Sequence, residues 1–174
     1  NNRVSTLSRE KEDIISVINK IEFKKKSSFL STFEAVGNNF KNIFTKVSED
    51  LRGALLLEKP HSPLEGGIEV KMMNDKGKHV SLAALSGGEK VLVALAFIFA
   101  IQEYNPAPFY LLDEIDAALD GVNSERVAKL LKEYSQKAQV IVISHNDAII
   151  SAANQIYGVW KNKAGESLIT VSYT

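Results

Sequence analysis

The sequence predicts an α/β fold with parallel strands and helical crossovers, a β-rich segment and a preceding long helical part. Two short apolar runs, Phe109–Asp113 and Gln139–Ile143, are separated by a helical pattern. Strands that alternate with helices of about 10 to 15 residues form parallel sheets. Apolar residues at helical spacing through residues 1–51 predict the preceding helical part.

The composition is that of an ordinary globular protein. The chain has 174 residues, 45% of them hydrophobic and 24% charged, with a formal net charge of zero and no cysteine. This length predicts one domain with a real core. Zero net charge argues against a surface devoted entirely to nucleic acid, and the absence of cysteine excludes disulfides and thiolate metal sites. The longest apolar stretch, Val91–Ile101, falls short of the roughly 20 residues that span a membrane. A polar start without Met predicts a fragment that carries no signal peptide.

The first residues predict an amphipathic helix. Apolar residues recur in steps of three and four, as in a heptad seam, so this helix is either the base of a coiled coil or a surface helix packed on its own domain. Lys24–Lys26 and Ser27–Ser28 are expected to interrupt the seam. The basic triplet predicts a solvent-exposed helix face, and contact with nucleic acid is the alternative. The seam positions are Val4, Leu7, Lys11, Ile14, Ile18 and Ile21.

A second helix and a β-rich segment are predicted next. Apolar residues from Phe29 to Leu51 follow helical spacing and are expected to pack in the core. Ala54–Leu57 and Ile68–Met72 predict short strands, and Asn74–Lys78 predicts a hairpin turn. His61 and His79 are expected at the surface, since no carboxylate or cysteine cluster surrounds them.

From Ser86 onward, helices and strands alternate. The segment closes with two strands around a turn at residues 161–165. The expected helices are residues 86–102, 123–134 and 147–153, and the expected strands are residues 109–113, 139–143, 156–160 and 167–171.

Ser86-Gly87-Gly88-Glu89 is the first candidate site. Ser followed three residues later by Glu, before an apolar run, is a capping box, which by itself explains a helix start. The two glycines are not explained in that way, because each weakens a helix by about 1 kcal/mol relative to Ala. They permit another backbone or a phosphate to approach the free amides at the positive end of a helix. The motif therefore predicts an anion site.

Asp113 and Glu114 end the strand that begins at Phe109. Acidic residues sometimes only terminate a buried strand. However, the carboxyl ends of parallel strands are where α/β sheets place ligands. An aspartate there suits Mg²⁺, and a neighbouring glutamate suits a general base or a group that orients water against a γ-phosphate.

His145 follows the second parallel strand. A lone histidine after a strand is more often structural, but two parallel strands end side by side, so His145 is expected to reach the same region as Glu114. Asp116 and Asp120 lie in the loop after the first strand. Each is interpreted as a solvated acid or a helix cap, and Asp120 alternatively as a residue that points across an interface.

Taken together, these residues resemble the ABC-type ATPases. The run Leu-Ser-Gly-Gly-Glu is followed by a Walker B strand with Asp-Glu, then by Ala-Leu-Asp and by Ser-His, with 27 residues from Ser86 to Asp113 and 32 from Asp113 to His145. Within that superfamily the sequence is most similar to the structural maintenance of chromosomes (SMC) family. Glu89 and Ile115-Asp116 differ from the Gln and Pro-Thr that ABC transporters usually carry at these places. The resemblance is strong from residue 82 to 174, and residues 1–50 fit only as the base of a returning coiled coil.

The resemblance implies a split ATPase head, of which this chain looks like the C-terminal lobe. Residues 1–27 are then the base of the coiled-coil helix and residues 28–174 the lobe. No phosphate loop of the form G-x-x-x-x-G-K-[ST] is present, since Gly77-Lys78 is followed by His79 and has no glycine at the required spacing. The isolated chain is therefore expected to be inactive, and ATP hydrolysis is expected only when the N-terminal lobe is joined to it.

The resemblance also implies a role for each matching residue. Ser86, Gly87 and Gly88 would bind the γ-phosphate of ATP held by a second head, and Glu89 would belong to the same nucleotide-binding motif. Asp113 would support Mg²⁺, Glu114 would activate water, His145 would sense the γ-phosphate and Asp120 would lie at the head–head interface.

The implied cofactors are ATP and Mg²⁺. The implied partners are the N-terminal lobe of the same head, a second SMC head, the C-terminal winged-helix domain of a kleisin and, for the whole complex, DNA. Tyr157, Trp160 and Tyr173 are candidate anchors for the kleisin, or ordinary packing residues.

The function that the resemblance implies is ATP-dependent head dimerisation and ATP hydrolysis in chromosome condensation, segregation and cohesion. The implied location is the cytoplasm, in association with the nucleoid or chromosome, or the nucleus in a eukaryote. Two alternatives stay open: the head lobe of a coiled-coil double-strand-break repair ATPase, and a kleisin-docking module without activity of its own.

Overall fold

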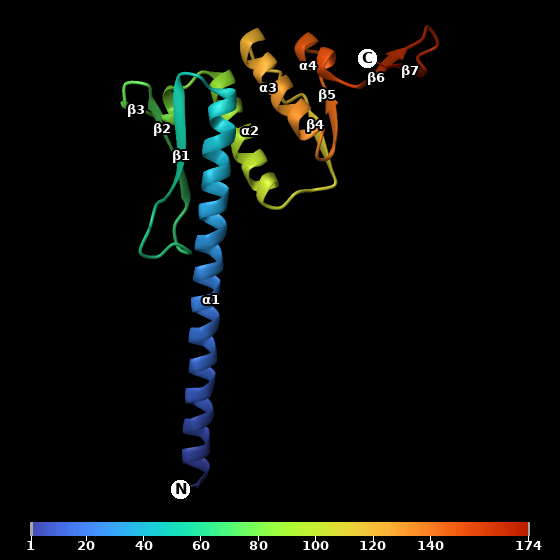
Figure 1. Ribbon diagram of the computed structural model, residues 1–174. Helices are drawn as coiled ribbons and strands as arrows, with labels where there is room; N and C mark the ends of the chain where they lie inside the picture. The colour runs from blue at the N-terminus through green and yellow to red at the C-terminus, as the bar shows by residue number, and fades with distance from the viewer. Residues whose placement is uncertain (1, 174) are drawn as a thin grey trace.

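A long helix carries a head of three small sheets and three further helices (Figure 1). The computed structural model describes residues 2–173, and side chains from residue 6 onward. The N-terminus lies at the far end of the long helix, and the C-terminal hairpin projects from the opposite side of the head. Among residues 2–173, none of the helices combines the length and the continuous apolar character that a membrane span requires.

The long helix α1 is continuous from Asn2–Val47. The predicted interruption at residues 24–28 is therefore wrong, and one helix replaces two. Lysine is a good helix former, and Lys24–Lys26 and Ser27–Ser28 are all exposed, so no buried contact opposes a straight path through them. The exposure of the triplet agrees with a solvated face.

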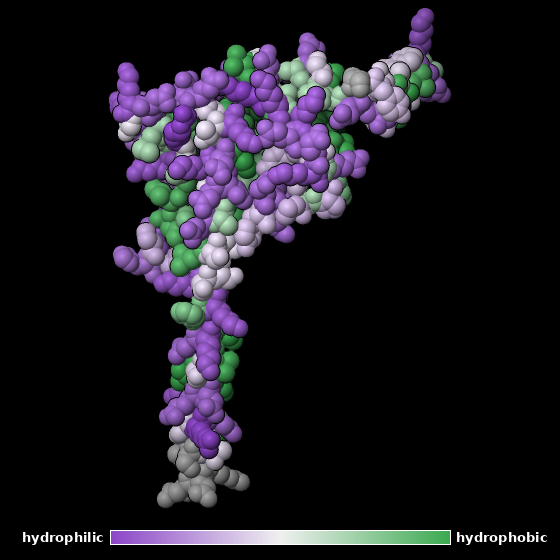
Figure 2. All heavy atoms as spheres, viewed as in Figure 1, coloured by the Kyte–Doolittle hydropathy of each residue, from purple (hydrophilic) through white to green (hydrophobic). Residues whose placement is uncertain are grey.

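The two ends of α1 have different surroundings. Near the N-terminus the predicted seam is exposed, with Leu7 64% and Ile14 60% accessible, and apolar groups stand among polar ones in Figure 2. The side chain of Val4 lies outside the described residues. Near the C-terminus α1 enters the core, where Phe40 and Phe44 stack with ring centroids 5.6 Å apart and Val47 is fully buried. Core packing of this second apolar series is confirmed from Phe33 onward, although Leu51 belongs to the first strand and not to the helix.

An antiparallel sheet follows α1, as the sequence predicts. Strands β1 (Leu51–Leu57), β2 (Ile68–Asn74) and β3 (His79–Val80) lie in sequence order. The hairpin turn between β2 and β3 holds Gly77 at φ 71°, a left-handed conformation that glycine adopts without strain. His61 and His79 are exposed, as expected.

The α/β part is also confirmed. A 3₁₀ turn, η1 (Leu82–Ala84), leads into α2 (Gly87–Tyr104). Strands β4 (Phe109–Asp113) and β5 (Gln139–Ile143) pair in parallel, with Asp113 opposite Ile143. The remaining helices are α3 (Gly121–Tyr134) and α4 (Asp147–Ala152).

The last two strands form a separate hairpin. Strands β6 (Gln155–Lys161) and β7 (Ser167–Tyr173) pair only with one another among the described strands. The hairpin stands apart from the body of the head and carries apolar groups at its surface (Figures 1 and 2). Tyr157, Trp160 and Tyr173 are 60%, 52% and 77% exposed, so packing within this chain does not account for them.

One face of the parallel pair is also uncovered. Alternate residues of β4 and β5 are exposed apolar side chains: Phe109, Leu111, Ile141 and Ile143. Parallel sheets are normally covered on both faces. Side chains of the other face, such as Leu112, Val140 and Val142, pack against the core of this chain.

A candidate nucleotide site

The loops after β4 and β5 meet at the same edge of the sheet. The amide of Glu114 donates to the carbonyl oxygen of Ile143 at 2.9 Å, which extends the parallel ladder by one residue. His145 Nε2 lies 3.7 Å from Glu114 Oε1. The prediction that His145 reaches the region of Glu114 is therefore confirmed. Both side chains face solvent, at 89% exposure for His145 and 60% for Glu114.

Glu114 has a strained backbone. Its φ is 47°, in the left-handed region, where an L-residue costs about 1 kcal/mol or more. The hydrogen bond to Ile143 on one side, and that from the Ala117 amide to the Glu114 carbonyl (3.2 Å) on the other, hold this conformation. Strain of this kind concentrates at functional sites.

Asp116 differs from its predicted environment. The sequence suggested a solvated acid or a helix cap, but its side chain is buried, with 7% exposed. The Ser144 hydroxyl donates to Asp116 Oδ2 at 2.6 Å, across from one loop to the other. The sequence pattern carried no sign of this contact, because the two residues meet only through the pairing of β4 with β5.

Ser86 begins α2 through the predicted capping box. Its Oγ accepts from the Glu89 amide at 3.2 Å, and the Glu89 carboxylate accepts from the Ser86 amide at 2.8 Å. The Ser86 hydroxyl also donates to that carboxylate at 2.7 Å. The cap thus uses both side chains and leaves the amides of the two glycines at the helix end.

The two glycines have different surroundings. A Cβ at Gly88 would lie 3.1 Å from the Ala118 carbonyl oxygen, so the close backbone approach expected of a glycine occurs here within the chain. A Cβ at Gly87 would meet nothing within 4 Å. Gly88 therefore docks α2 on the loop after β4, whereas Gly87 faces open space where a ligand has access.

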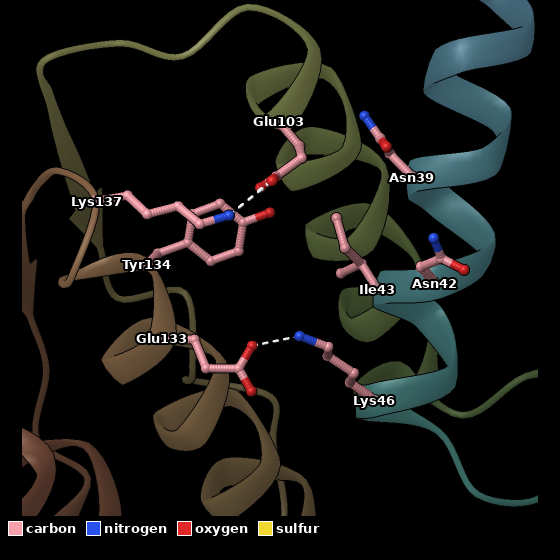
Figure 3. A pocket seen from close by; sticks show the side chains of 8 residues that line it. All are labelled: Asn39, Asn42, Ile43, Lys46, Glu103, Glu133, Tyr134 and Lys137. Carbon is pink, nitrogen blue, oxygen red and sulfur yellow. Dashed lines mark hydrogen bonds and ion pairs between the residues drawn. The ribbon is translucent and has the colours of Figure 1, made fainter.

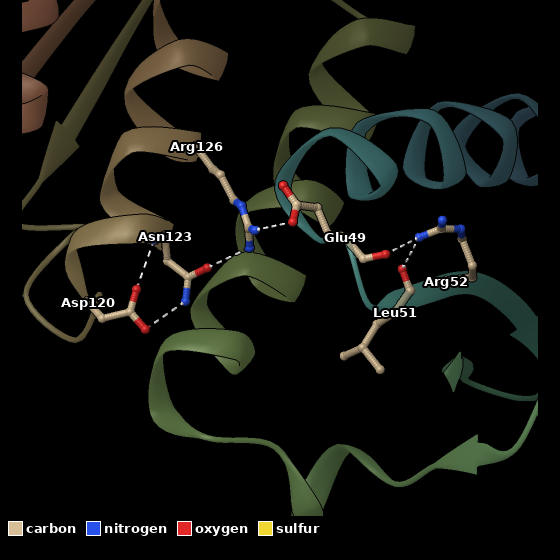
Figure 4. Close-up of polar contacts among 6 residues, drawn as sticks. All are labelled: Glu49, Leu51, Arg52, Asp120, Asn123 and Arg126. Carbon is tan, nitrogen blue, oxygen red and sulfur yellow. Dashed lines mark hydrogen bonds and ion pairs between the residues drawn. The ribbon is translucent and has the colours of Figure 1, made fainter. Parts of the chain in front are cut away.

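Asp120 is the N-cap of α3. Its carboxylate accepts from the amide of Asn123 at 2.8 Å and from the Asn123 side chain at 3.3 Å, which confirms the cap interpretation (Figure 4). Asn123 accepts in turn from Arg126, whose guanidinium pairs with Glu49 at 3.0 Å. A line of polar contacts thus runs from Asp120 to Glu49, in the bend between α1 and β1. Spacing along α3 was compatible with Asp120–Asn123–Arg126, but the reach to Glu49 required the tertiary structure.

A small polar cavity of about 160 Å³ lies among α1, α2 and α3 (Figure 3). Two ion pairs, Lys46–Glu133 and Lys137–Glu103, cross it. The hydrogen bond from Lys137 holds the pKa of Glu103 below its ordinary value. Burial, with the nearby carboxylate of Glu103, raises the pKa of Tyr134. The lysines and glutamates that line the cavity pair with one another, so the cavity is part of the packing between the helices. None of its lining residues belongs to the sheet edge that carries Glu114.

The carboxylates at the sheet edge suit a magnesium ion whose remaining ligands are water molecules and phosphate oxygens. Among residues 6–173 there is no group of three or more His, Cys, Asp or Glu placed to hold a metal. Mg²⁺ at nucleotide sites typically takes one or two carboxylates together with substrate phosphates. Asp113, exposed at the end of β4, is a fitting oxygen ligand of that kind.

Comparison with known proteins identifies the family. The family model for the RecF/RecN/SMC N terminal domain matches residues 3–168. The chain belongs to this family. A chromosome partition protein Smc of Pyrococcus furiosus is 48% identical over 167 residues, which are 95% of this chain and 14% of that protein. The Smc of Methanocaldococcus jannaschii is 43% identical over 152 residues, 87% of this chain and 13% of that protein. The chain thus spans about one seventh of the curated relatives it matches.

Solved structures of Smc heads share the fold. A Pyrococcus furiosus Smc head domain with an extended coiled coil, bound to the C-terminal domain of ScpA, matches 97% of this chain and 42% of that chain with a TM-score of 0.88 and 46% identity. A structure from work on ATP-driven dimerization and DNA stimulated activation of SMC ATPases matches 84% of this chain and 89% of that chain, at TM-score 0.77 and 44% identity. The mixed α/β fold is that of an Smc head with the base of its coiled coil.

One expectation is corrected by these findings. The chain was expected to be the C-terminal half of an SMC head, but the family model that matches residues 3–168 describes the N terminal domain. That assignment is wrong, and neither the repair-ATPase head nor the inactive docking module fits better. The prediction rested on the motif resemblance together with the missing phosphate loop, and the absence of one motif does not locate a segment within a longer protein.

Proposed function

We propose that this chain is part of an ATP-hydrolysing Smc head that acts in chromosome partition, and that the edge formed by Asp113, Glu114 and His145 is its hydrolytic site. The observation that carries the proposal is the meeting of Glu114 and His145, 3.7 Å apart, beside Asp113 at the carboxyl ends of two parallel strands. This is the edge at which α/β sheets bind ligands. Relatives described as SMC ATPases support the reaction class.

The roles follow from the chemistry of each side chain. Glu114 accepts a proton from, or orients, the water that attacks the γ-phosphate, and His145 donates a hydrogen bond to that phosphate. Asp113 would hold Mg²⁺, which neutralises charge on the phosphates when bound. The exposure of Glu114 and His145 leaves room for substrate between this edge and further polypeptide.

The glycine pair serves a different part of the reaction. Ser86 and Gly87 present a capped helix N-terminus to open space, where the helix dipole and free amides favour a phosphate. This surface takes the γ-phosphate of ATP held by a second head, with Asp120 near the junction. ATP then joins two heads and hydrolysis separates them. The exposed apolar face of β4 and β5 is assigned to a contact with further polypeptide of the full-length protein.

The projecting hairpin gives the head a docking surface. Tyr157, Trp160 and Tyr173 expose aromatic area on β6 and β7, and such residues often anchor interfaces. Two related Smc heads were solved bound to the C-terminal domain or C-winged helix domain of ScpA. We assign the hairpin to a kleisin of that kind.

Glu114→Gln in the full-length protein tests the hydrolytic site. Glutamine keeps the size of the side chain and removes its basicity, so the rate of phosphate release should fall at least about 100-fold while ATP stays bound. Heads should remain paired in ATP, as measured by size-exclusion chromatography. Glu125→Gln, an exposed acid on α3, is the matched control and should hydrolyse normally. Near-normal turnover by Glu114→Gln would remove the basis of the proposal.

A further inference from the structure

Four polar side chains tie the two loops of the candidate site together beneath its surface. Ser144 bridges the loops, since its hydroxyl donates to Asp116 Oδ2 at 2.6 Å and accepts from the Asn146 amide at 2.9 Å. The Asn146 side chain continues the line and donates to Ser124 Oγ at 2.9 Å. Ser124 is fully buried at the start of α3. The contacts therefore join the loop after β4, the loop after β5 and a rigid helix.

The Asp116–Ser144 hydrogen bond lies directly beside the two candidate reactive side chains. Asp116 lies two residues after Glu114, and Ser144 and Asn146 flank His145. Glu114 and His145 are themselves mostly exposed, so neighbouring side chains do not fix them. Their positions depend on the backbone of the two loops, and the Asp116–Ser144 hydrogen bond is a buried side-chain contact that joins those loops.

A buried carboxylate is costly unless hydrogen bonds compensate it. Asp116 is 7% exposed and its carboxylate receives the short bond from Ser144. An apolar residue of similar size would fill this space at no such cost. The contact instead holds one specific distance between the two loops, against the strain stored at Glu114.

We infer that Asp116 is a positioning residue for hydrolysis, which acts through Ser144 to hold Glu114 and His145 at their mutual distance. This inference rests on the proposed function of that edge. Asp116 makes no contact with the nucleotide in this role. Its removal should slow the chemical step and leave ATP binding intact, because the loops then sample wider separations.

The test uses the full-length protein and steady-state ATP hydrolysis. Asp116→Ala and Ser144→Ala should each lower kcat about tenfold with KM for ATP changed less than twofold, since small misplacements of reacting groups cost rate steeply. The double variant should have a kcat no lower than that of the slower single variant, because both substitutions remove the same contact. Asp116→Asn keeps an oxygen that accepts from Ser144 and should recover most of the rate.

Three results would overturn the inference. The first is an unchanged kcat in Ser144→Ala, and the second is additive losses of kcat in the double variant. The third is an Asp116→Asn variant as slow as Asp116→Ala, because that result would assign the charge itself a role such as metal binding. Ser144→Ala leaves the carboxylate in place and keeps the test decisive if Asp116→Ala does not fold. Asp147→Ala, an exposed acid at the start of α4, is the control. If the wild-type protein itself fails to hydrolyse ATP, or Glu114→Gln hydrolyses normally, the proposed function fails, which separates the two failures.

Discussion

Two identical substitutions at adjacent positions, Gly87→Ala and Gly88→Ala, should have opposite effects on stability. Alanine is favoured over glycine within a helix by about 0.5–1 kcal/mol. At Gly87 the added methyl meets nothing within 4 Å, so this gain should appear in full. At Gly88 it would lie 3.1 Å from the Ala118 carbonyl oxygen, a backbone atom that yields only if the loop moves.

The expected difference follows from these two terms. A clash that forces backbone to shift costs about 1–3 kcal/mol, which outweighs the helix gain at Gly88. We expect Gly87→Ala to raise the free energy of unfolding by about 0.5 kcal/mol and Gly88→Ala to lower it by about 1 kcal/mol. Urea denaturation of the 174-residue chain, followed by circular dichroism, measures both. Equal shifts in the two variants would refute the assigned surroundings.

The same pair also separates stability from function. Gly87 faces the open space assigned to the phosphate of a second head, so Gly87→Ala in the full-length protein should weaken ATP-dependent head pairing although the fold is more stable. Size-exclusion chromatography with ATP measures the pairing. A Gly87→Ala protein that pairs as tightly as wild type would count against a phosphate at this helix end.

Two further predictions concern other parts of the chain. Lys137→Ala should destabilise the chain by about 0.5 kcal/mol at neutral pH, because an exposed ion pair is worth little. The pKa of Glu103 is lowered in the folded state, so the contribution of the ion pair is present above the ordinary pKa of 4.5 and is lost as the pH falls through the lowered value. Urea denaturation of both proteins across this pH range measures the contribution. A stability difference of the same size in strong acid would contradict the prediction. Trp160→Ala should weaken binding of a ScpA C-terminal domain at least about 30-fold by isothermal titration, as for an aromatic anchor, without changing stability. Lys163→Ala in the hairpin turn is the control, and unchanged affinity of Trp160→Ala would remove the hairpin from the docking surface.

Much of the local structure could be predicted because its causes are local. The capping box at Ser86 and Glu89 needs residues three apart on one helix, and the structure shows both of its hydrogen bonds. The alternation of apolar runs and helical patterns predicted β4 and β5 as parallel neighbours. Helical continuity through residues 24–28 was missed because exposed lysines and serines neither require nor forbid a break.

The residue types and their spacing specify the chemical groups that the chain carries: a glycine pair at a helix start, two carboxylates after one strand and a histidine after the next. How these groups lie relative to one another depends on the folded chain. Asp116 is buried against Ser144, and Gly88 packs on the Ala118 carbonyl whereas Gly87 faces solvent. One face of the parallel strand pair is uncovered. Each of these depends on contacts between residues far apart in the chain. Such contacts are set by strand pairing and helix docking, which no local pattern encodes.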